Sequence, residues 1–467
     1  MRSTIYQIVL LYLRFFARLS LFFHKPKIIG ITGSVGKTST REAIYAMLKE
    51  YAPTKMIKKG NSEIGIPLGI LGLQVKTNSI TDWTRLLFLA PLRLKYLKKT
   101  KYLVVEMGID EPDPPKNMEF LLTIVKPEIC IFLNVFPVHT MQFEKTIPNL
   151  LQSTKLSDEE KMNLILKRIA EEKGKLVTQN PRCTTVIYNA DNEYVRDLVN
   201  MFRNSDENTR DKQFLAFGEN SENSLFYKGY DITLRGTNFE FRLEQQQQSI
   251  KLQLSRFLLP QVYEETFAAT ILAGKAVGLS KAQIVTGILQ HFELPAGRSS
   301  IFHGIKDSII IDSSYNASKR PVLAFLELLS KLRSEEERPT VFLFGDMREL
   351  GERARQEHEE VVENIPSVVQ YLYCVGPLTK KYVIPRLQKY LKEVRWFENS
   401  QDAGEYLRAN LPERALVLVK GSQNTIYLEE ALKFILKDKA DIARLCRQDE
   451  FWRRKKEKFF QSTAWGK

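Results

Sequence analysis

The sequence predicts an α/β protein made of two successive units, each built on a mostly parallel sheet. Three observations support this fold class. Short apolar runs alternate with helix-like stretches in both halves of the chain, which is typical of strands joined by helical crossovers. A glycine-containing loop directly follows the first apolar run, and segments of alternating polarity stand between the two halves. The chain has 467 residues, which is enough for two or three domains with cores of their own.

The first predicted unit covers residues 27–295. Its first strand is KIIGI at 27–31, and the composition of Thr38 to Lys49 predicts a helix directly after the glycine-containing loop. Three further β-rich runs predict the rest of a parallel sheet: YLVVEMG at 102–108, EICIFLNV at 128–135 and TTVIYNAD at 184–191. From Gln213 to Phe257, the alternation of polar and apolar residues predicts an antiparallel meander appended to this sheet. A helical block at 264–292 completes the unit.

The second predicted unit covers residues 296–440 and is a Rossmann-like α/β domain. LPAGR at 294–298 has the composition of a linker that leads into it. Four evenly spaced runs predict its strands: DSIIIDSS at 307–314, TVFLFGD at 340–346, YLYCVG at 371–376 and LVLVKGS at 416–422. The residues ahead of the first unit, 1–26, and those behind the second, 441–467, form two basic terminal segments.

The stretch GITGSVGKTST at 30–40 is the strongest functional signal. The standard phosphate-binding loop has a glycine where this chain has Ile31. The glycines of the stretch still allow the backbone to approach an anion, and the following helix offers free N–H groups. Lys37 supplies a positive charge, and Thr38 supplies a hydroxyl ligand for Mg²⁺. A Gly-Ser turn before an ordinary helix is the alternative, but Gly-Lys-Thr directly after an apolar strand favours a P-loop ATPase domain.

Three other residues are weaker candidates on their own. Glu106 ends the predicted strand YLVVE, where open α/β sheets gather their ligands, and it could hold Mg²⁺ beside Thr38. A carboxylate that simply faces solvent is its alternative. His139 also follows a strand, although a lone histidine is more often structural than a ligand. Lys173 reads as an ordinary surface lysine.

The formal charge of +14 is concentrated at the two ends of the chain. No acidic residue precedes Glu42, and basic residues interrupt the apolar segment IYQIVLLYLRFFARLSLFF. Its longest charge-free run is about half of a membrane span, so we expect a helix in the membrane interface, with a packed helix or a true span as alternatives. The segment from Phe451 to Phe460 has the composition of a segment that docks on anionic lipid, and a solvated tail is the alternative. Nucleic acid is disfavoured, because no nucleic-acid module accompanies the charge.

The four cysteines indicate a reducing compartment. They are far apart and include no Cys-x-x-Cys pair, so neither a disulfide framework nor a zinc ribbon is predicted. A secretory signal is a further interpretation of the N-terminal segment, but no small-residue cleavage site follows it. We expect a cytoplasmic protein, peripheral on the inner face of the cytoplasmic membrane, and a monomer.

Several motifs together resemble the Mur ligase family. They occur in the family's order: TGSVGKTS, GNSEIGIPL at 60–68, VVEMG, NVFPVH, GR at 297–298, DSSYNAS at 312–318, GDMRELG at 345–351 and VKGS at 419–422. The resemblance covers about residues 27–436 and is greatest to the branch that adds D-alanyl-D-alanine to a muramoyl tripeptide. It implies an ATP- and Mg²⁺-dependent ligase of peptidoglycan precursor synthesis, which activates a carboxylate as an acyl phosphate and joins it to an amine.

The resemblance also assigns roles to residues. It implies ATP binding by Thr32, Gly33, Ser34, Gly36, Lys37, Thr38, Ser39, Arg298 and Asp312. It implies that metal is held by Thr38, Glu106, His139 and a carbamylated Lys173, and that Lys37, Glu106, His139 and Lys173 are catalytic. It implies binding of the muramoyl peptide and of the amino acid or dipeptide by Asn61, Tyr315, Asn316 and Lys420. For Asp346 and Glu349 a purely structural role is equally open, because GDMRELG also has the pattern of a strand end followed by a helix cap.

The chain departs from the family pattern at several positions. LLPQVYEET at 258–266 lacks the His-Asn pair that approaches adenine in the family, and Ser313 and Gln423 replace an aspartate and an arginine. Only about 29 residues precede the phosphate loop, so the family's N-terminal UDP-binding domain does not fit there. Two other functions therefore stay open: a Mur-type ligase or amidating enzyme with a lipid-linked or other acceptor, and a nonenzymatic ATP-binding scaffold.

Overall fold

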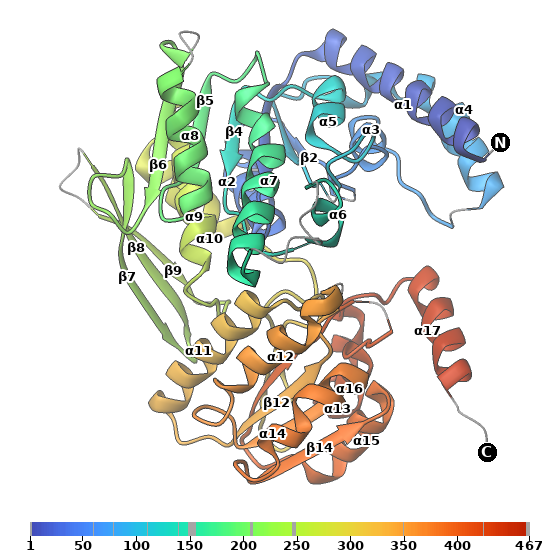
Figure 1. Cartoon of the computed structure of the whole chain (residues 1–467), viewed down its shortest axis with the longest axis vertical. Helices are drawn as coiled ribbons and strands as arrows, with labels where there is room; N and C mark the ends of the chain where they lie inside the picture. Colours follow the sequence, from blue (N-terminus) through green and yellow to red (C-terminus); the bar gives the residue numbers. More distant parts are fainter. Residues whose placement is uncertain are drawn as a thin grey trace. The chain divides into compact units, whose positions relative to one another are not determined.

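A computed structural model describes most of the chain. The described residues are 2–58, 60–77, 79–109, 111–138, 140–147, 156–205, 209–244, 249–348, 350–423 and 425–463. Contacts within the chain divide it into two compact units (Figure 1). Unit 1 comprises Met1–Gly229, Phe239–Leu252 and Tyr263–Glu293, and unit 2 comprises Tyr230–Asn238, Gln253–Val262 and Leu294–Lys467.

A sheet of nine strands organises unit 1, and its strand order is β2-β3-β1-β4-β5-β6-β7-β8-β9. The strands are β1 (Lys27–Thr32), β2 (Thr54–Met56), β3 (Tyr102–Glu106), β4 (Ile129–Phe132), β5 (Thr185–Asn189), β6 (Gln213–Gly218), β7 (Leu225–Thr233), β8 (Gly236–Leu243) and β9 (Ser249–Leu254). Each neighbouring pair from β2 to β7 is parallel, which confirms the predicted parallel sheet. The prediction that the meander begins at Gln213 is wrong, because β6 pairs in parallel with β5.

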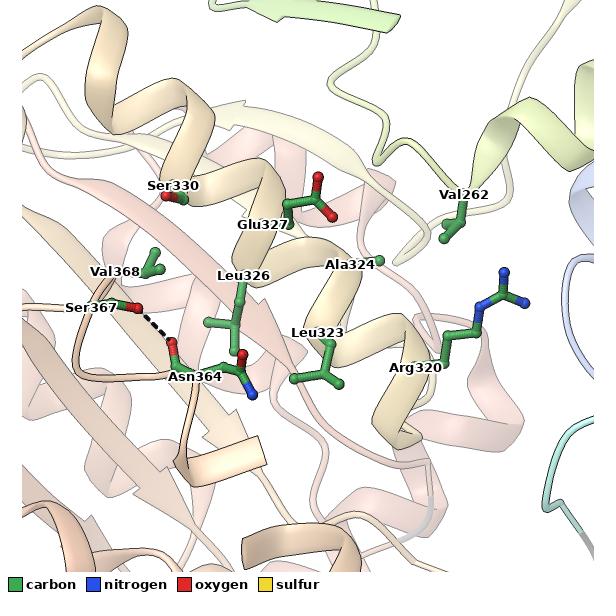
Figure 2. Close-up of a pocket in the computed structure, with 10 residues that line it drawn as sticks. All are labelled: Val262, Arg320, Leu323, Ala324, Leu326, Glu327, Ser330, Asn364, Ser367 and Val368. Atoms are coloured by element: carbon green, nitrogen blue, oxygen red, sulfur yellow. Dashed lines mark hydrogen bonds between the residues drawn. The ribbon is translucent and has the colours of Figure 1, made fainter. Parts of the chain in front are cut away.

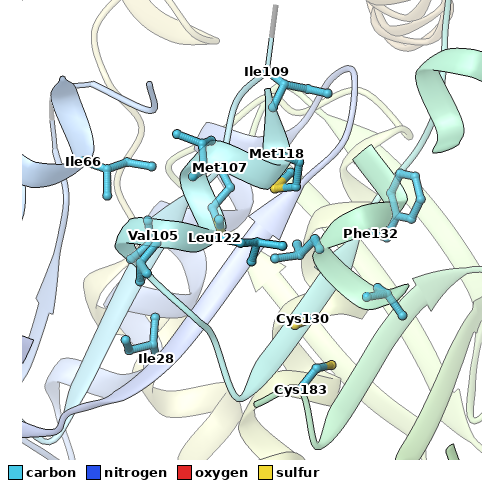
Figure 3. Packing of buried hydrophobic residues seen from close by; sticks show 14 of the residues in the cluster. Ile28, Ile66, Val105, Met107, Ile109, Met118, Leu122, Cys130, Phe132 and Cys183 are labelled. Atoms are coloured by element: carbon cyan, nitrogen blue, oxygen red, sulfur yellow. The ribbon is translucent and has the colours of Figure 1, made fainter. Parts of the chain in front are cut away.

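The position of β1 in the middle of this sheet follows from its residues. Its burial pattern leaves only the first residue half-exposed, as expected of a strand covered on both faces. Gly30 is required there, since a Cβ atom would lie 2.4 Å from Pro127 Cγ. Ile28 on β1 contributes to the largest core cluster, together with Val105 and Phe132 from the neighbouring strands (Figure 3).

Helices cover both faces of the unit 1 sheet. They are α1 (Arg2–His24), α2 (Lys37–Lys49), α3 (Gly65–Ile70), α4 (Ile80–Leu92), η1 (Leu94–Leu97), α5 (Met118–Ile124), α6 (Thr140–Glu144), α7 (Asp158–Thr178), α8 (Glu193–Ser205), α9 (Tyr263–Ala276) and α10 (Lys281–His291). Helices α7 and α8 lie together on one face, and α2, α9 and α10 contact one another on the other face (Figure 1). The helix after the phosphate loop is therefore α2, and it begins at Lys37, within one residue of the prediction.

Unit 2 contains a six-stranded sheet with the order β10-β11-β15-β12-β13-β14. The strands are β10 (Ser300–His303), β11 (Ile309–Asp312), β12 (Thr340–Gly345), β13 (Tyr371–Val375), β14 (Glu393–Phe397) and β15 (Leu416–Lys420). All neighbours are parallel except β10 and β11. The four predicted strands are present, and the two unpredicted ones, β10 and β14, form the edges of the sheet.

Helices surround this second sheet and continue to the C-terminus. They are α11 (Lys319–Glu335), η3 (Gly351–Arg353), α12 (Ala354–Val362), α13 (Pro377–Tyr382), α14 (Ile384–Leu387), α15 (Ser400–Asn410), α16 (Glu429–Ile435), η4 (Lys439–Arg444) and α17 (Glu450–Thr463). The segment from Phe451 to Phe460, for which a lipid-docking segment and a solvated tail were both expected, is part of helix α17. Most of its charged residues are exposed, but Lys456 is buried and pairs with acids of α16, and Arg447 before the helix does the same.

Candidate active site

The loop between β1 and α2 has the backbone geometry of an anion-binding loop. Gly33 and Gly36 have φ angles of 147° and 85°, which a residue with a side chain rarely adopts. Space is also limiting, since a Cβ at Gly33 would lie 3.0 Å from Leu133 Cβ. Lys37 Nζ donates to the carbonyls of Gly33 at 2.6 Å and Ser34 at 3.1 Å, so its ammonium group lies over the loop.

Asn134 holds this loop in place, and sequence reasoning missed its role. Its Oδ1 accepts from the N–H groups of Ser34 at 3.1 Å and Val35 at 2.9 Å. Its Nδ2 donates to Glu265 Oε2 on α9 at 2.7 Å. The signal was the asparagine directly after the strand EICIFL, in the motif NVFPVH. Glu265 left no comparable signal, because its partner lies 131 residues away in sequence.

Glu106 is the centre of a buried polar cluster at the carboxyl end of β3. Thr38 Oγ1 donates to its Oε2 at 3.0 Å, and Asn61 Nδ2 donates to its Oε1 at 3.2 Å. Arg41 Nη1 also donates to Oε2, at 3.2 Å, and the arginine is itself buried. The structure thus brings together three residues singled out in the sequence, and it adds Arg41. We call Thr38, Arg41, Asn61 and Glu106 the Glu106 cluster.

The structure does not bring the other two predicted metal ligands, His139 and Lys173, to the Glu106 cluster among the residues that it describes. His139 lies outside the described residues. Lys173 lies on α7 and is buried, next to Glu172, which accepts a hydrogen bond from the Met118 N–H at 3.0 Å. Among the described residues, no three side chains of His, Cys, Asp or Glu gather where a metal ion could bind. The roles of His139 and Lys173 stay predictions.

In unit 2, Asp312 and Lys420 lie at the carboxyl ends of the adjacent strands β11 and β15. Lys420 Nζ donates to Ser313 Oγ at 3.1 Å and to the Asn316 carbonyl at 3.0 Å. Burial and, next, the charge of Arg298 lower the pKa of Lys420 to about 7. Burial raises the pKa of Asp312 to about 6, although its Oδ1 accepts from the Ser314 N–H.

The loop after β11 contains DSSYNAS and is held by two arginines. The Arg298 guanidinium lies over the Tyr315 ring, 4.5 Å from its centroid. Arg447 donates to the carbonyls of Ser314 at 3.0 Å and Tyr315 at 3.1 Å, and it forms a bidentate pair with Glu429. Sequence reasoning missed Arg447 and Glu429. Single charged residues 18 positions apart carry no pattern that would connect them.

Two family models match the chain. The model described as the Mur ligase middle domain matches residues 31–156, and the model described as the Mur ligase, glutamate ligase domain, matches residues 297–423. The first match includes the phosphate loop and the Glu106 cluster, and the second includes Asp312 and Lys420. The chain belongs to the Mur ligase family.

Individual Mur ligases are similar over most of the chain. The UDP-N-acetylmuramoyl-tripeptide–D-alanyl-D-alanine ligase of Rickettsia prowazekii (strain Madrid E) is 24% identical over 400 residues, which are 85% of this chain and 76% of that protein. The ligase of the same name from Buchnera aphidicola subsp. Acyrthosiphon pisum (strain APS) is 22% identical, and the match covers 89% of this chain and 77% of that one. The fold is similar to the structure of the Thermotoga maritima MurF ligase in complex with ADP, with a TM-score of 0.67, 21% identity, and 91% and 83% of the two chains covered.

Membership of the Mur ligase family fixes the class of chemistry. Members of the family are ATP-dependent ligases that form C–N bonds and use ATP with Mg²⁺, and this chain is an enzyme of that class. The expected α/β fold with a second α/β domain is confirmed.

The GDMRELG motif of this Mur ligase has a structural role at the described positions. Asp346 is buried, and its Oδ1 accepts from the Thr379 N–H at 2.8 Å. His358 is fully buried, so its pKa is lowered, and the neutral ring accepts from the Met347 N–H at Nε2 and donates from Nδ1 to the Ala354 carbonyl. These bonds fix the turn after β12. Glu349 lies outside the described residues.

Two surface hollows of unit 2 have linings that include neither Asp312 nor Lys420. One, of about 460 Å³, lies along the side of α11 (Figure 2) and is lined by Val262, Arg320, Leu323, Ala324, Leu326, Glu327, Ser330, Asn364, Ser367 and Val368. Its lining includes none of the predicted site residues. The other, of about 480 Å³, lies at the end of β12 and β13 and is lined by Met347, Arg348, Leu350, Gly351, Ala354, Pro377, Leu378 and Gln423.

Proposed function

We propose that this Mur ligase acts in peptidoglycan precursor synthesis, where it joins D-alanyl-D-alanine or a similar amine to the carboxylate of a muramoyl peptide. The observation that carries the proposal is the Glu106 cluster beside the phosphate loop. Loop and cluster together combine the Lys37 ammonium, which would contact a phosphate, with hydroxyl and carboxylate oxygens at the end of a parallel strand. The names of the curated relatives support the substrate class.

The Glu106 cluster fits a magnesium ion. Mg²⁺ prefers oxygen ligands in octahedral geometry at about 2.0–2.1 Å, so two adjacent ligand oxygens lie about 2.9 Å apart. Thr38 Oγ1 and Glu106 Oε2 are 3.0 Å apart. The ion would be held by these two oxygens, where it would neutralise the phosphate charge. Asn61 and Arg41 keep the carboxylate oriented toward Thr38.

The proposed reaction has two steps. A carboxylate oxygen of the muramoyl peptide attacks the γ-phosphorus, the bond to the ADP oxygen breaks, and an acyl phosphate forms. The amine then attacks the acyl carbon, phosphate leaves, and a proton is lost from nitrogen. The Lys37 ammonium and the loop N–H groups stabilise the charge on the transferring phosphoryl group. Arg298 and Asp312 are proposed to contact ATP, and Tyr315, Asn316 and Lys420 the substrates.

Carbamylation of Lys173 is a further part of this proposal. Addition of CO2 requires the neutral amine, and Lys173 is a buried lysine on α7. The resulting carboxylate would support a second Mg²⁺.

The test is phosphate release from ATP and Mg²⁺ by the purified full-length protein. UDP-muramoyl-tripeptide and D-alanyl-D-alanine are added singly and together, and Lys37→Ala and Lys173→Ala are run in parallel. We expect release that requires both substrates and is lost in Lys37→Ala. A wild-type protein that binds ATP but releases no phosphate with this pair would contradict the proposed substrates.

A further inference from the structure

One side of helix α1 packs against the rest of unit 1. By length and composition, Ile5–His24 is the one described helix that could cross a membrane, and 22% of that window is buried. Its buried side is tied by polar contacts as well as by packing. Tyr6 donates to Glu63 Oε1 at 2.6 Å, and Ser20 donates to the Leu94 carbonyl at 3.0 Å. A membrane span would break these bonds, so α1 belongs to the fold of unit 1.

The other side of α1 is apolar and exposed. Its residues recur every three or four positions, which places them on one face of the helix. They are Ile5, Ile8, Leu11, Tyr12, Phe15, Phe22 and Phe23, and Phe22 is 67% exposed. A soluble protein rarely exposes so many large apolar side chains on one helix, so this face needs a partner.

Helix α4, which contacts α1, also exposes large apolar residues. Ile80 is 83% exposed and Phe88 is 73% exposed, and Leu92 on the same helix is also exposed. The two helices lie side by side at one end of unit 1 (Figure 1), and Tyr12 Oη donates to the Leu87 carbonyl at 3.1 Å. We call the exposed apolar residues of α1 and α4 the α1–α4 face.

The charges in the segments around the α1–α4 face are mostly positive, although the buried Glu63 accepts from Tyr6 of α1. Residues 2–27 contain five Lys or Arg and no acid, and residues 64–101 contain seven Lys or Arg and one acid, Asp82. Asp82 is itself buried and paired with Arg85. Arg18 is exposed on α1, and the Lys25 ammonium lies over the Phe22 ring. Apolar residues with aromatics, bordered by cations, are the composition of a surface that docks on anionic lipid.

We propose that the α1–α4 face binds the surface of an anionic lipid bilayer, with α1 lying in the interface rather than across the membrane. Burial of the exposed side chains in the acyl boundary supplies the attraction, and the lysines and arginines contact lipid phosphates. A second copy of this chain fits less well, because two such faces would bring their positive charges together. The proposal does not depend on which substrates the enzyme uses.

The test is co-sedimentation of the full-length protein with vesicles of phosphatidylglycerol and phosphatidylcholine, compared with phosphatidylcholine alone. Phe15→Glu changes α1, Phe88→Glu changes α4, and Met201→Glu is the matched control, because Met201 is equally exposed on α8. We expect binding to the anionic vesicles that weakens with salt. Each of the first two variants should weaken it by about tenfold or more, since a charge replaces a ring that is buried in the bilayer on binding, and the control should not.

Several results would overturn the proposal. They are absence of binding to anionic vesicles, equal binding by all four proteins, and loss with Phe15→Glu but not with Phe88→Glu. Protein that stays in cell membranes after an alkaline carbonate wash would indicate a span instead. A wild-type dimer that Phe88→Glu converts to a monomer, without vesicle binding, would assign the face to a second copy. Thermal melting of every variant separates these outcomes from misfolding.

Discussion

At the scale of single residues, the candidate site depends on one buried carboxylate that several side chains share. Glu106 accepts hydrogen bonds from Thr38, Arg41 and Asn61. A carboxylate held in this way is positioned before any ion arrives, so little reorganisation accompanies metal binding. The same arrangement makes the position sensitive, because a substitution also removes one of the two carboxylates that pair with the buried Arg41, the other being Glu42.

Glu106→Gln should therefore impair the use of Mg²⁺ more than the fold. The amide oxygen is a poorer ligand for a hard cation, and the negative charge is lost. We expect the Mg²⁺ concentration for half-maximal phosphate release to rise at least about tenfold, as for loss of a ligand or its support. Glu63→Gln is the control, because Glu63 is also buried but accepts from Tyr6. An unchanged Mg²⁺ titration in Glu106→Gln would remove this residue from the proposed metal site.

Lys420 should make the free energy of unfolding depend on pH. Its pKa is lowered to about 7 in the folded protein by burial and by Arg298, against the charge of Asp312. The unfolded chain therefore binds more protons than the folded one between pH 7 and the ordinary lysine pKa of about 10.4. The free energy of unfolding should rise with pH across this window, by at most about 1.4 kcal/mol per pH unit.

The measurement is urea unfolding from pH 6 to pH 9 for the wild type and for Lys420→Met. In the variant, the free energy of unfolding should no longer rise with pH by the amount that Lys420 contributes. Asp312 acts in a different window: its raised pKa of about 6 adds stability at low pH that is lost as pH rises through that value. Parallel curves for the two proteins above pH 7 would mean that Lys420 titrates normally.

At the scale of elements, the segment after α16 braces the DSSYNAS loop. Arg447 joins Glu429 on α16 to the carbonyls of Ser314 and Tyr315. Lys456 on α17 pairs with the same Glu429 and with Glu430, and no described bond connects it to the loop. Arg447 and Lys456 thus both pair with Glu429, but only Arg447 contacts the loop among the described bonds.

This difference makes Arg447 a positioning residue that can be tested. Arg447→Gln should weaken the fold by at most about 3–5 kcal/mol, because the buried Glu429 carboxylate loses its bidentate partner and keeps only Lys456, and should raise the KM for substrates bound near the loop. Arg447→Lys should restore part of the stability but not the KM, since lysine lacks the planar fork. Lys456→Met should lower stability with KM unchanged. Equal KM values in all four proteins would leave Arg447 with a purely structural role.

At the scale of the whole molecule, the periodicity of the sequence predicted where most strands lie, but it predicted less well which direction neighbouring strands run. The runs at 102–108 and 340–346 became strands, because both faces are buried and the apolar signal is continuous. The direction of β6 was not predictable, since alternation does not distinguish parallel from antiparallel neighbours. The edge strands β10 and β14 were missed, because half-buried residues give a weak pattern.

The candidate site was predictable to a similar extent. Lys37, Thr38 and Glu106 follow strands in short motifs, and their positions at strand ends indicate where they meet. Arg41, Asn134 and Arg447 act through partners that are distant in sequence, so only the folded chain connects them. Asn134 stands in the motif NVFPVH, but the motif does not indicate that its side chain binds the N–H groups of the phosphate loop.

The bonds from Asn134 to the phosphate loop also bear on the thermodynamics of nucleotide binding. Because the N–H groups of Ser34 and Val35 already donate to its Oδ1, a phosphate oxygen must compete for donors that are satisfied. The gain in hydrogen-bond enthalpy is then small, as one acceptor replaces another. The loop backbone, however, is already ordered, which avoids a loss of about 1–2 kcal/mol of conformational entropy per residue. Affinity for the nucleotide would thus depend on rigidity that is present before binding.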